Sequence, residues 1–387
     1  MIMAWVLLAI IVGSVVFHIV NPWWLTPLAS NWKTMDDTLT ITVAITGAFF
    51  VAINLFVVYA LVKFRHREGG SQAIAVPDNK KLERWLIIAT SVGVAALLAP
   101  GLVVYANYVN EPRDALQLEV LSQQWQWRFR LPGADGKLGA TDARFVSAGN
   151  PYGLDPDDAR GKDDLLVPGN EVHLPLGKPV VVLLRSHDVL HDFFVPQFRA
   201  RMNTVPGQVS RFWFTPQAVG RYEALCAQLC GVGHPDMRGY VVVEEAPTFT
   251  AWQQGLSTFA MAQEAAAKMA SAPSGSAGTL VEQGRQVADA KGCVACHTID
   301  GSPRVGPTWK GLYGKNENMA DGTTELVDEA YLRGFIRNPQ AKHVKGFPPV
   351  MPKLALSDEE VAALVAYIQT LGKAPPSAAA GEQKVQR

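Results

Sequence analysis

The chain has no excess of charge of either sign, because Lys+Arg and Asp+Glu both total 35. A nucleic-acid-binding protein needs a clustered basic surface, and nothing in this balance indicates one. Cysteine is also scarce: the 387 residues include four, in two close pairs, Cys226/Cys230 and Cys293/Cys296. By spacing alone each pair could be a disulfide, a buried thiol pair or a ligand site, so the neighbouring His and Met residues must decide.

Charged side chains are missing from two long apolar runs, Ile41–Val62 and Leu86–Ala106. Each run has about the 20 residues that a helix needs to cross the hydrocarbon core, and Pro100 is tolerated there as a kink. The runs predict a transmembrane hairpin over residues 35–112. The short connection between them carries an excess of Lys and Arg, which marks the cytoplasmic side. Everything after Ala106 is therefore expected on the periplasmic face of a bacterial plasma membrane.

A third apolar stretch, Ala4–Val20, lacks the positively charged n-region of a signal peptide. Cleavage near Ala29 is an alternative, but the Trp-rich segment Pro22–Trp32 is typical of an interfacial belt. We expect residues 1–34 to form an uncleaved additional helix followed by this interfacial segment.

The outer part divides by composition. Residues 113–246 contain short β-branched and aromatic runs punctuated by Gly and Pro, which predict an all-β sandwich or barrel. Residues 247–278 turn from a helix-favouring composition to a flexible Ala/Ser/Gly/Pro linker. Residues 279–374 contain two amphipathic helices, the second opened by a capping box of Ser357 and Glu360. Residues 375–387 are predicted to be a disordered tail.

The densest set of metal ligands is Cys226–Met237, with two thiols, one thioether and the imidazole of His234. Soft sulfur ligands select copper, and an imidazole completes a tetrahedral or trigonal set. A mononuclear (blue) copper site has one cysteine in a loop of this composition, together with a distant His and an axial Met. A second cysteine lets two thiolates bridge two coppers, each of which then needs a histidine. His187 and His191 are both candidates for the second histidine, and the residues alone do not choose between them.

The strings Asp188–His191 and Cys226–Met237 follow a two-helix hairpin and resemble the binuclear copper (CuA) motif of cytochrome c oxidase subunit II. The resemblance covers residues 35–245 and implies a cupredoxin-like sandwich. It also implies the ligands of the two coppers: His191, Cys226, Cys230, His234 and Met237 through side chains, and Gln228 through its backbone carbonyl. Both sulfurs would bridge, with His191 and Met237 on one copper and His234 and the Gln228 carbonyl on the other.

The position of Gln228 departs from the family pattern. Many members carry a Glu there, and its carboxylate binds magnesium at the interface with subunit I. An uncharged amide is a weaker oxygen ligand, which argues against magnesium in this chain. The copper bond uses the main chain and is unaffected.

Two tryptophans stand in the string Gln124-Trp125-Gln126-Trp127 and by alternation share one strand face. Core packing is the simpler interpretation, above all for Trp127. In the family, the first Trp of such a string is exposed near the copper and is the point where electrons enter. Trp125 matches that position, although Gln126 stands where the family usually has an aromatic residue.

The second cysteine pair lies in Cys293-Val-Ala-Cys296-His297, the C-x-x-C-H pattern of c-type haem attachment. The thiols would form thioethers to the haem, and His297 would be an axial ligand. A redox dithiol is the competing interpretation, but it needs a βαβ setting that is absent here. Met351, in a proline-bounded loop, is the expected second axial ligand, because a Met/His pair raises the reduction potential. His343 is the rival.

Residues 279–373 resemble a class I cytochrome c. Gly284, the C-x-x-C-H string, Gly306-Pro307, Met351-Pro352 and a final helix with Tyr367 occur in family order. The resemblance implies that the Pro307 carbonyl accepts the proton of His297 and fixes its ring. With both cysteine pairs assigned, no disulfide is expected.

These resemblances predict the subunit through which electrons enter a respiratory haem–copper oxidase. Electrons would pass from cytochrome c or a quinol–cytochrome c reductase to the fused haem, then to CuA, and on to an oxygen-reducing, proton-pumping subunit I. Subunit III and membrane lipid are further expected partners. Two alternatives stay open: a CuA-containing nitric oxide reductase subunit, and a membrane-anchored copper or electron shuttle. Nitrous oxide reductase is excluded, because the chain has no room for its large His-rich propeller.

Overall fold

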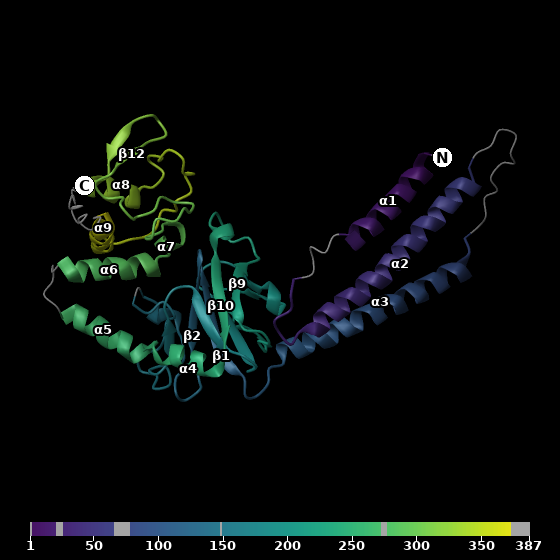
Figure 1. Cartoon of the computed structure of the whole chain (residues 1–387), viewed down its shortest axis with the longest axis horizontal. Coiled ribbons are helices and arrows are strands. Elements are labelled where there is room, and N and C mark those ends of the chain that lie inside the picture. The colour runs from purple at the N-terminus through teal and green to yellow at the C-terminus, as the bar shows by residue number, and fades with distance from the viewer. Residues whose placement is uncertain (1, 21–25, 66–77, 148, 272–276, 373–387) are drawn as a thin grey trace, which may run out of the picture.

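The computed structural model describes residues 2–20, 26–65, 78–147, 149–271 and 277–372. Figure 1 shows three long helices at one end, a β-sheet region in the middle and a small, mainly helical part at the other end. This arrangement confirms the expected multi-domain fold class. The expected tail, 375–387, lies outside the described residues, as do most of the cytoplasmic connection and the Pro/Ser/Gly core of the linker.

The three N-terminal helices are each long and apolar enough to cross a membrane. They are α1 (Ile2–Val20), α2 (Lys33–Lys63) and α3 (Lys80–Val109). Helix α3 continues through Pro100, as membrane helices allow. Their apolar side chains are largely exposed, which suits a lipid environment and would be costly in water.

The membrane hairpin is fixed to the sandwich by an aromatic cluster. Trp32 packs edge-on against Tyr108 and Trp213, and its indole N–H donates to the Trp213 carbonyl at 2.8 Å. Arg199 adds a bidentate ion pair with Asp36, with contacts of 2.6 and 2.8 Å. Trp32 is 4 % exposed. Trp32 therefore packs inside the protein, between the membrane hairpin and the sandwich, and the interfacial role of the segment 22–32 stays a prediction.

The β region is a sandwich of two sheets with one shared apolar core. The first sheet has the order β11-β3-β2-β1-β5-β8 and the second the order β4-β10-β9-β6-β7. The strands are β1 (Leu116–Gln123), β2 (Gln126–Leu131), β3 (Leu165–Val167), β4 (Glu171–Pro175), β5 (Val180–Ser186), β6 (His191–Val195), β7 (Ala200–Thr204), β8 (Ser210–Phe214), β9 (Gly220–Cys226), β10 (Arg238–Glu244) and β11 (Ser257–Thr258).

The alternating run that begins at Leu116 forms a hairpin and not one long strand. β1 and β2 pair antiparallel, with Gln123 opposite Gln126, and Trp125 lies in the turn between them. The prediction that Trp125 and Trp127 share a strand face is therefore wrong. Trp127, at 1 % exposure, is a core residue as expected.

Much of the segment expected to be a linker belongs to the sandwich. Helix α4 (Ala246–Gln254) buries Phe249 and stacks Trp252 on His173, with ring centroids 4.5 Å apart. β11 pairs with β3, and Phe259, at the start of α5 (Phe259–Ser271), is 2 % exposed. Residues 272–276 lie outside the described residues, and helix α6 already begins at Ala277. The aromatic residues of this segment explain why it packs on the sandwich, because packing buries apolar area that a free linker would leave in water.

The C-terminal part has its own apolar core. Its elements are α6 (Ala277–Ala290), α7 (Cys293–Cys296), β12 (Asn316–Asn318), β13 (Thr324–Leu326), α8 (Glu329–Arg337) and α9 (Asp358–Gly372). The capping box before α9 is present: the Glu360 N–H donates to Ser357 Oγ at 3.2 Å, and the Ser357 N–H donates to Glu360 Oε2 at 2.9 Å. The short β12–β13 pair is an addition to the all-α part that we expected.

Helices α6 and α9 cross closely at Gly284. A Cβ there would clash with the Ala363 carbonyl oxygen and lie 2.7 Å from Tyr367 Cβ. We expect Gly284→Ala to destabilise the C-terminal part by roughly 1–3 kcal/mol, because overpacking a core forces the backbone apart. Thermal unfolding of the full-length protein, followed by haem absorbance, measures the change.

Gly334 provides the matched control. It lies inside α8 with nothing within 4 Å of an added Cβ. Gly334→Ala should therefore be neutral or stabilise by about 0.5–1 kcal/mol, through the helix propensity of Ala alone. A Gly284→Ala variant that unfolds at the same temperature as the native protein would show that α6 and α9 do not cross in contact at this residue.

Candidate metal and haem sites

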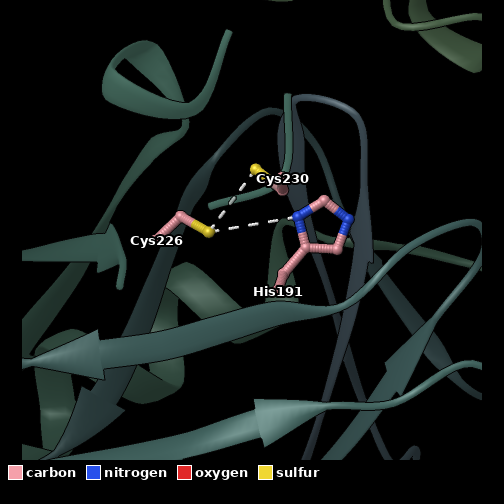
Figure 2. A group of neighbouring side chains, drawn as sticks. All are labelled: His191, Cys226 and Cys230. Atoms are coloured by element: carbon pink, nitrogen blue, oxygen red, sulfur yellow. Dashed lines mark hydrogen bonds between the residues drawn. The ribbon is translucent and has the colours of Figure 1, made fainter. Parts of the chain in front are cut away.

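The two sulfurs of the first cysteine pair lie close together where strand β9 ends. Cys226 ends β9, and Cys230 lies in the loop that follows. Their Sγ atoms are 3.7 Å apart, which is too far for a disulfide, whose bond is about 2.05 Å. Both side chains are buried. Figure 2 shows the sulfurs and the His191 ring turned toward one another.

The other expected ligands surround this sulfur pair. His191 Nδ1 is 4.0 Å from Cys226 Sγ, and His234 Nδ1 is 3.6 Å from Cys230 Sγ. Two further donors complete the set: Met237 Sδ lies 4.0 Å from Cys230 Sγ, and the Gln228 carbonyl oxygen lies 3.2 Å from Cys226 Sγ. Two soft thiolates, two imidazoles, a thioether and a carbonyl around one small space fit copper chemistry.

The structure separates the two candidate histidines. His187 directs Nε2 to the Pro151 carbonyl, 2.5 Å away, and takes no part in the sulfur group. His191, at the start of β6, places Nδ1 toward the sulfurs and Nε2 2.9 Å from Asp188 Oδ1. A carboxylate of this kind fixes the orientation of a metal-binding imidazole. Sequence reasoning gave Asp188 no role, although its spacing three residues before His191 is a usable signal.

The electrostatics of the sulfur pair favour one thiolate. The hydrogen bond from Cys230 lowers the pKa of Cys226, and the same bond, with burial, raises the pKa of Cys230. Burial lowers the pKa of His191, but the hydrogen bonds to Asp188 and Cys226 outweigh it, so the net shift is upward. An apo site with one shared proton must release it when metal binds, because copper takes deprotonated sulfur.

Trp125 packs on the loop from Cys226 to Met237, which contains most of the candidate metal ligands. Its indole N–H donates to the Cys230 carbonyl at 3.0 Å, and the Gln124 amide donates to the same oxygen at 2.8 Å. A Cβ at Gly233 would clash with the indole and lie 2.6 Å from its Cε3, so only glycine allows this contact. Trp125 is 7 % exposed. The expectation that Trp125 is exposed is therefore wrong, and its expected role in electron entry stays a prediction.

A single cavity joins the C-terminal part to this tryptophan. Apolar side chains dominate its wall, which also contains Cys293, Cys296, His297 and Met351 from one side and Trp125 from the other. A large apolar cleft with two cysteines and an imidazole fits a covalently bound haem.

Burial raises the pKa of Cys293 to about 12 and that of Cys296 to about 11. A reactive redox dithiol needs a lowered thiol pKa, so these shifts speak against that competing interpretation.

His297 is held in a fixed orientation. Its Nδ1 is 2.8 Å from the Pro307 carbonyl, the contact that the cytochrome resemblance implied. This bond leaves Nε2 as the ring nitrogen available to a metal. The ring stacks on Trp309, with centroids 5.3 Å apart, and a Cβ at Gly306 would lie 2.7 Å from its Cε1. Burial lowers the pKa of His297 despite the Pro307 contact, which favours the neutral, ligating form.

Met351 and His343 both line the cavity. The Met351 carbonyl accepts a hydrogen bond from Gln340 at 2.8 Å, which ties this loop to the segment after α8. His343 is exposed, whereas Met351 is half-buried. The geometry therefore keeps Met351 as the better candidate for the second axial position.

Comparisons with known proteins match the two parts of the chain that contain these candidate sites. Residues 116–246 match the family model described as cytochrome C oxidase subunit II, periplasmic domain, and residues 281–372 match that of cytochrome c. The alternative cytochrome c oxidase subunit 2 of Bradyrhizobium diazoefficiens is 53 % identical over 260 residues, which cover 67 % of this chain and 94 % of that protein. Cytochrome c oxidase subunit 2 of Alkalihalophilus pseudofirmus is 24 % identical over 355 residues, 90 % of each chain.

Among solved structures, the periplasmic domain of cytochrome oxidase subunit II of Bradyrhizobium japonicum is 26 % identical and covers 38 % of this chain and 95 % of that one. The TM-score is 0.28, which is too low to show a shared overall fold.

Proposed function

The chain belongs to the cytochrome c oxidase subunit II family, and from this premise we propose that it carries electrons from its own C-terminal haem c to a binuclear CuA centre in its sandwich. As a member, it is a subunit of a haem–copper oxidase, an oxidoreductase, and is anchored in a membrane with a periplasmic domain. The finer proposal adds the residues: His191, Cys226, Gln228, Cys230, His234 and Met237 for copper, and Cys293, Cys296, His297 and Met351 for haem.

One observation carries the proposal: the candidate copper ligands lie on one side of Trp125 and the candidate haem ligands on the other. The indole lines the cavity of Cys293, Cys296 and His297, and its N–H bonds to the carbonyl of Cys230. When bound, the haem supplies one-electron redox chemistry at a potential raised by a Met/His pair, and two coppers supply a shared-electron site. The residues of this chain would orient the ligand side chains, exclude water and keep the two sites in contact.

The partners follow from the same proposal. An oxygen-reducing, proton-pumping subunit I would lie beside α2 and α3 in a bacterial plasma membrane and take electrons from the copper side, with subunit III as a neighbour. An external cytochrome c or a quinol–cytochrome c reductase would reduce the haem. Gln228 contributes no carboxylate, so a magnesium ion at the subunit interface is not part of this proposal.

Purification of the intact complex in mild detergent tests the proposal. We expect about two coppers and about one covalent haem per chain, together with a haem-bearing membrane partner. Turnover on dioxygen, with none on nitric oxide, separates an oxidase from a nitric oxide reductase. Copper and haem without any co-purifying partner would instead indicate an electron shuttle, and a single copper would overturn the CuA assignment.

A further inference from the structure

Arg128, on β2 of the sandwich, has its charged partner in the C-terminal part of the chain. Its Nη1 donates to Asp289 Oδ2 at 2.7 Å and its Nη2 to the Asp289 carbonyl at 2.6 Å. The Arg128 side chain is 9 % exposed, whereas that of Asp289 is 47 % exposed. A buried guanidinium is costly unless it is paired. Because both of these bonds reach helix α6, this face of the sandwich is built to be covered by that helix.

Two glutamines extend the same contact. Gln126 Nε2 donates to the Asp289 carbonyl at 2.9 Å, and Gln123 Nε2 donates to the Ala290 carbonyl at 2.9 Å. Asp289 and Ala290 are the last residues of α6. The final carbonyls of a helix have no partner inside the helix and carry its partial negative charge. A cation and two amide donors from the hairpin β1–β2 therefore cap this helix end across the interface.

The contact positions the haem-binding segment that follows. Gly292, at φ +72°, comes so close to the hairpin turn that a Cβ there would lie 2.7 Å from the Gln124 carbonyl oxygen. Ala295, inside the C-x-x-C-H string, is 5 % exposed and packs into the apolar core that also contains Trp125. The segment thus lines the same cavity as Trp125, whose indole bonds to the Cys230 carbonyl.

We propose that Arg128, Gln123 and Gln126 form a docking site for the C-terminal end of α6, which holds the segment 293–297 on Trp125 and closes this face to external electron carriers. The inference rests on the proposed function, since it assigns the geometry through which the two redox sites meet. Its residues are positioning residues, because each acts through the helix that it binds. An external carrier must then deliver its electron to the C-terminal part.

Asp289→Lys is the direct test, made in the full-length, copper- and haem-loaded complex. It places a cation against Arg128 but leaves α6 itself intact, because a cation near a helix C-terminus is favourable. Glu282→Lys is the matched control: it makes the same change of charge on the same helix. Glu282 pairs with Arg285, at 2.5 Å on the exposed surface, and such a pair contributes little.

Two measurements are compared. Hydrogen exchange of peptides covering residues 123–128 and 289–297 reports docking without any turnover. Stopped-flow spectroscopy reports haem-to-copper transfer within the chain. For Asp289→Lys we expect exchange about tenfold faster or more, and transfer about tenfold slower or more, because a lysine beside the buried guanidinium of Arg128 replaces an attraction with a repulsion and weakens the docking of the helix. Arg128→Gln should change both measurements in the same direction, and Glu282→Lys should change neither.

The outcomes separate this inference from the proposed function. If Asp289→Lys exchanges and transfers like Glu282→Lys, the docking site is overturned while the electron route stands. If the native protein shows no haem-to-copper transfer at all, the proposed function fails, whatever the exchange data show. Faster exchange in Asp289→Lys with an unchanged transfer rate would overturn the claim that docking sets the route.

Discussion

Replacing Cys226 with serine should abolish the binuclear copper site and lower oxidase turnover by at least about 100-fold. Residues that merely orient a metal ligand cost about 10–100-fold when mutated, and Cys226 is a proposed ligand itself. A hydroxyl is a hard donor that does not bridge two coppers as a thiolate does. Electron paramagnetic resonance and metal analysis of the purified complex should show the loss of the signal of an electron shared by two coppers. The haem spectrum should stay unchanged.

His191 and His187 provide a matched pair of variants for this prediction. His191→Ala should disturb the copper signal, because Nδ1 of His191 lies 4.0 Å from Cys226 Sγ. His187→Ala should keep copper and turnover, because its ring bonds the Pro151 carbonyl and not the sulfur pair. Retention of the shared-electron signal and of normal turnover in Cys226→Ser would contradict the copper assignment.

Replacing Met351 with alanine should lower the reduction potential of the haem by on the order of 0.1 V, because axial ligands set haem potentials over about 0.8 V. A Met/His pair raises the potential, so its loss makes the haem a poorer electron acceptor. Each 59 mV is about tenfold in the equilibrium for a one-electron couple. Reduction of the haem by an external donor should therefore become unfavourable by more than about tenfold. Redox titration of the full-length complex measures the shift.

His343→Ala is the matched comparison, because His343 lines the same cavity. It is exposed, and we expect its replacement to leave the potential unchanged. If His343→Ala moves the potential while Met351→Ala does not, the second axial ligand is the histidine. If neither variant moves it, the iron takes no ligand from this loop.

Under the proposed function, the docking contact would add to what a flexible connection between the two redox sites provides. A tether alone raises the effective concentration of one unit near the other to the millimolar range. The contact between Arg128 and Asp289 goes further, because it fixes which face of the C-terminal part meets Trp125. Orientation matters for electron transfer as it does for any reaction between two held groups.

The sequence alone determined the kinds of chemistry and the elements that carry them. Three signals are local in the sequence: the apolar runs of membrane length, the thiol–imidazole–thioether string ending at Met237, and the C-x-x-C-H pattern. The length of the runs indicates membrane helices, and the side chains of the two cysteine-containing strings indicate the types of ligand. The capping box of Ser357 and Glu360 was equally local and is present. Such features depend on residues a few positions apart, so no knowledge of the fold is needed to read them.

Only the tertiary structure decided what depends on residues far apart in the chain. It placed the ring of His191, 35 residues before Cys226, beside the sulfurs and turned that of His187 to another partner, a choice that the residues alone left open and the family resemblance had implied. It put Trp125 in a covered turn, and it paired Arg128 with Asp289 across 161 residues. A buried contact between distant segments follows from how two folded surfaces pack. Neither periodicity nor spacing in one segment encodes the partner that the other segment supplies.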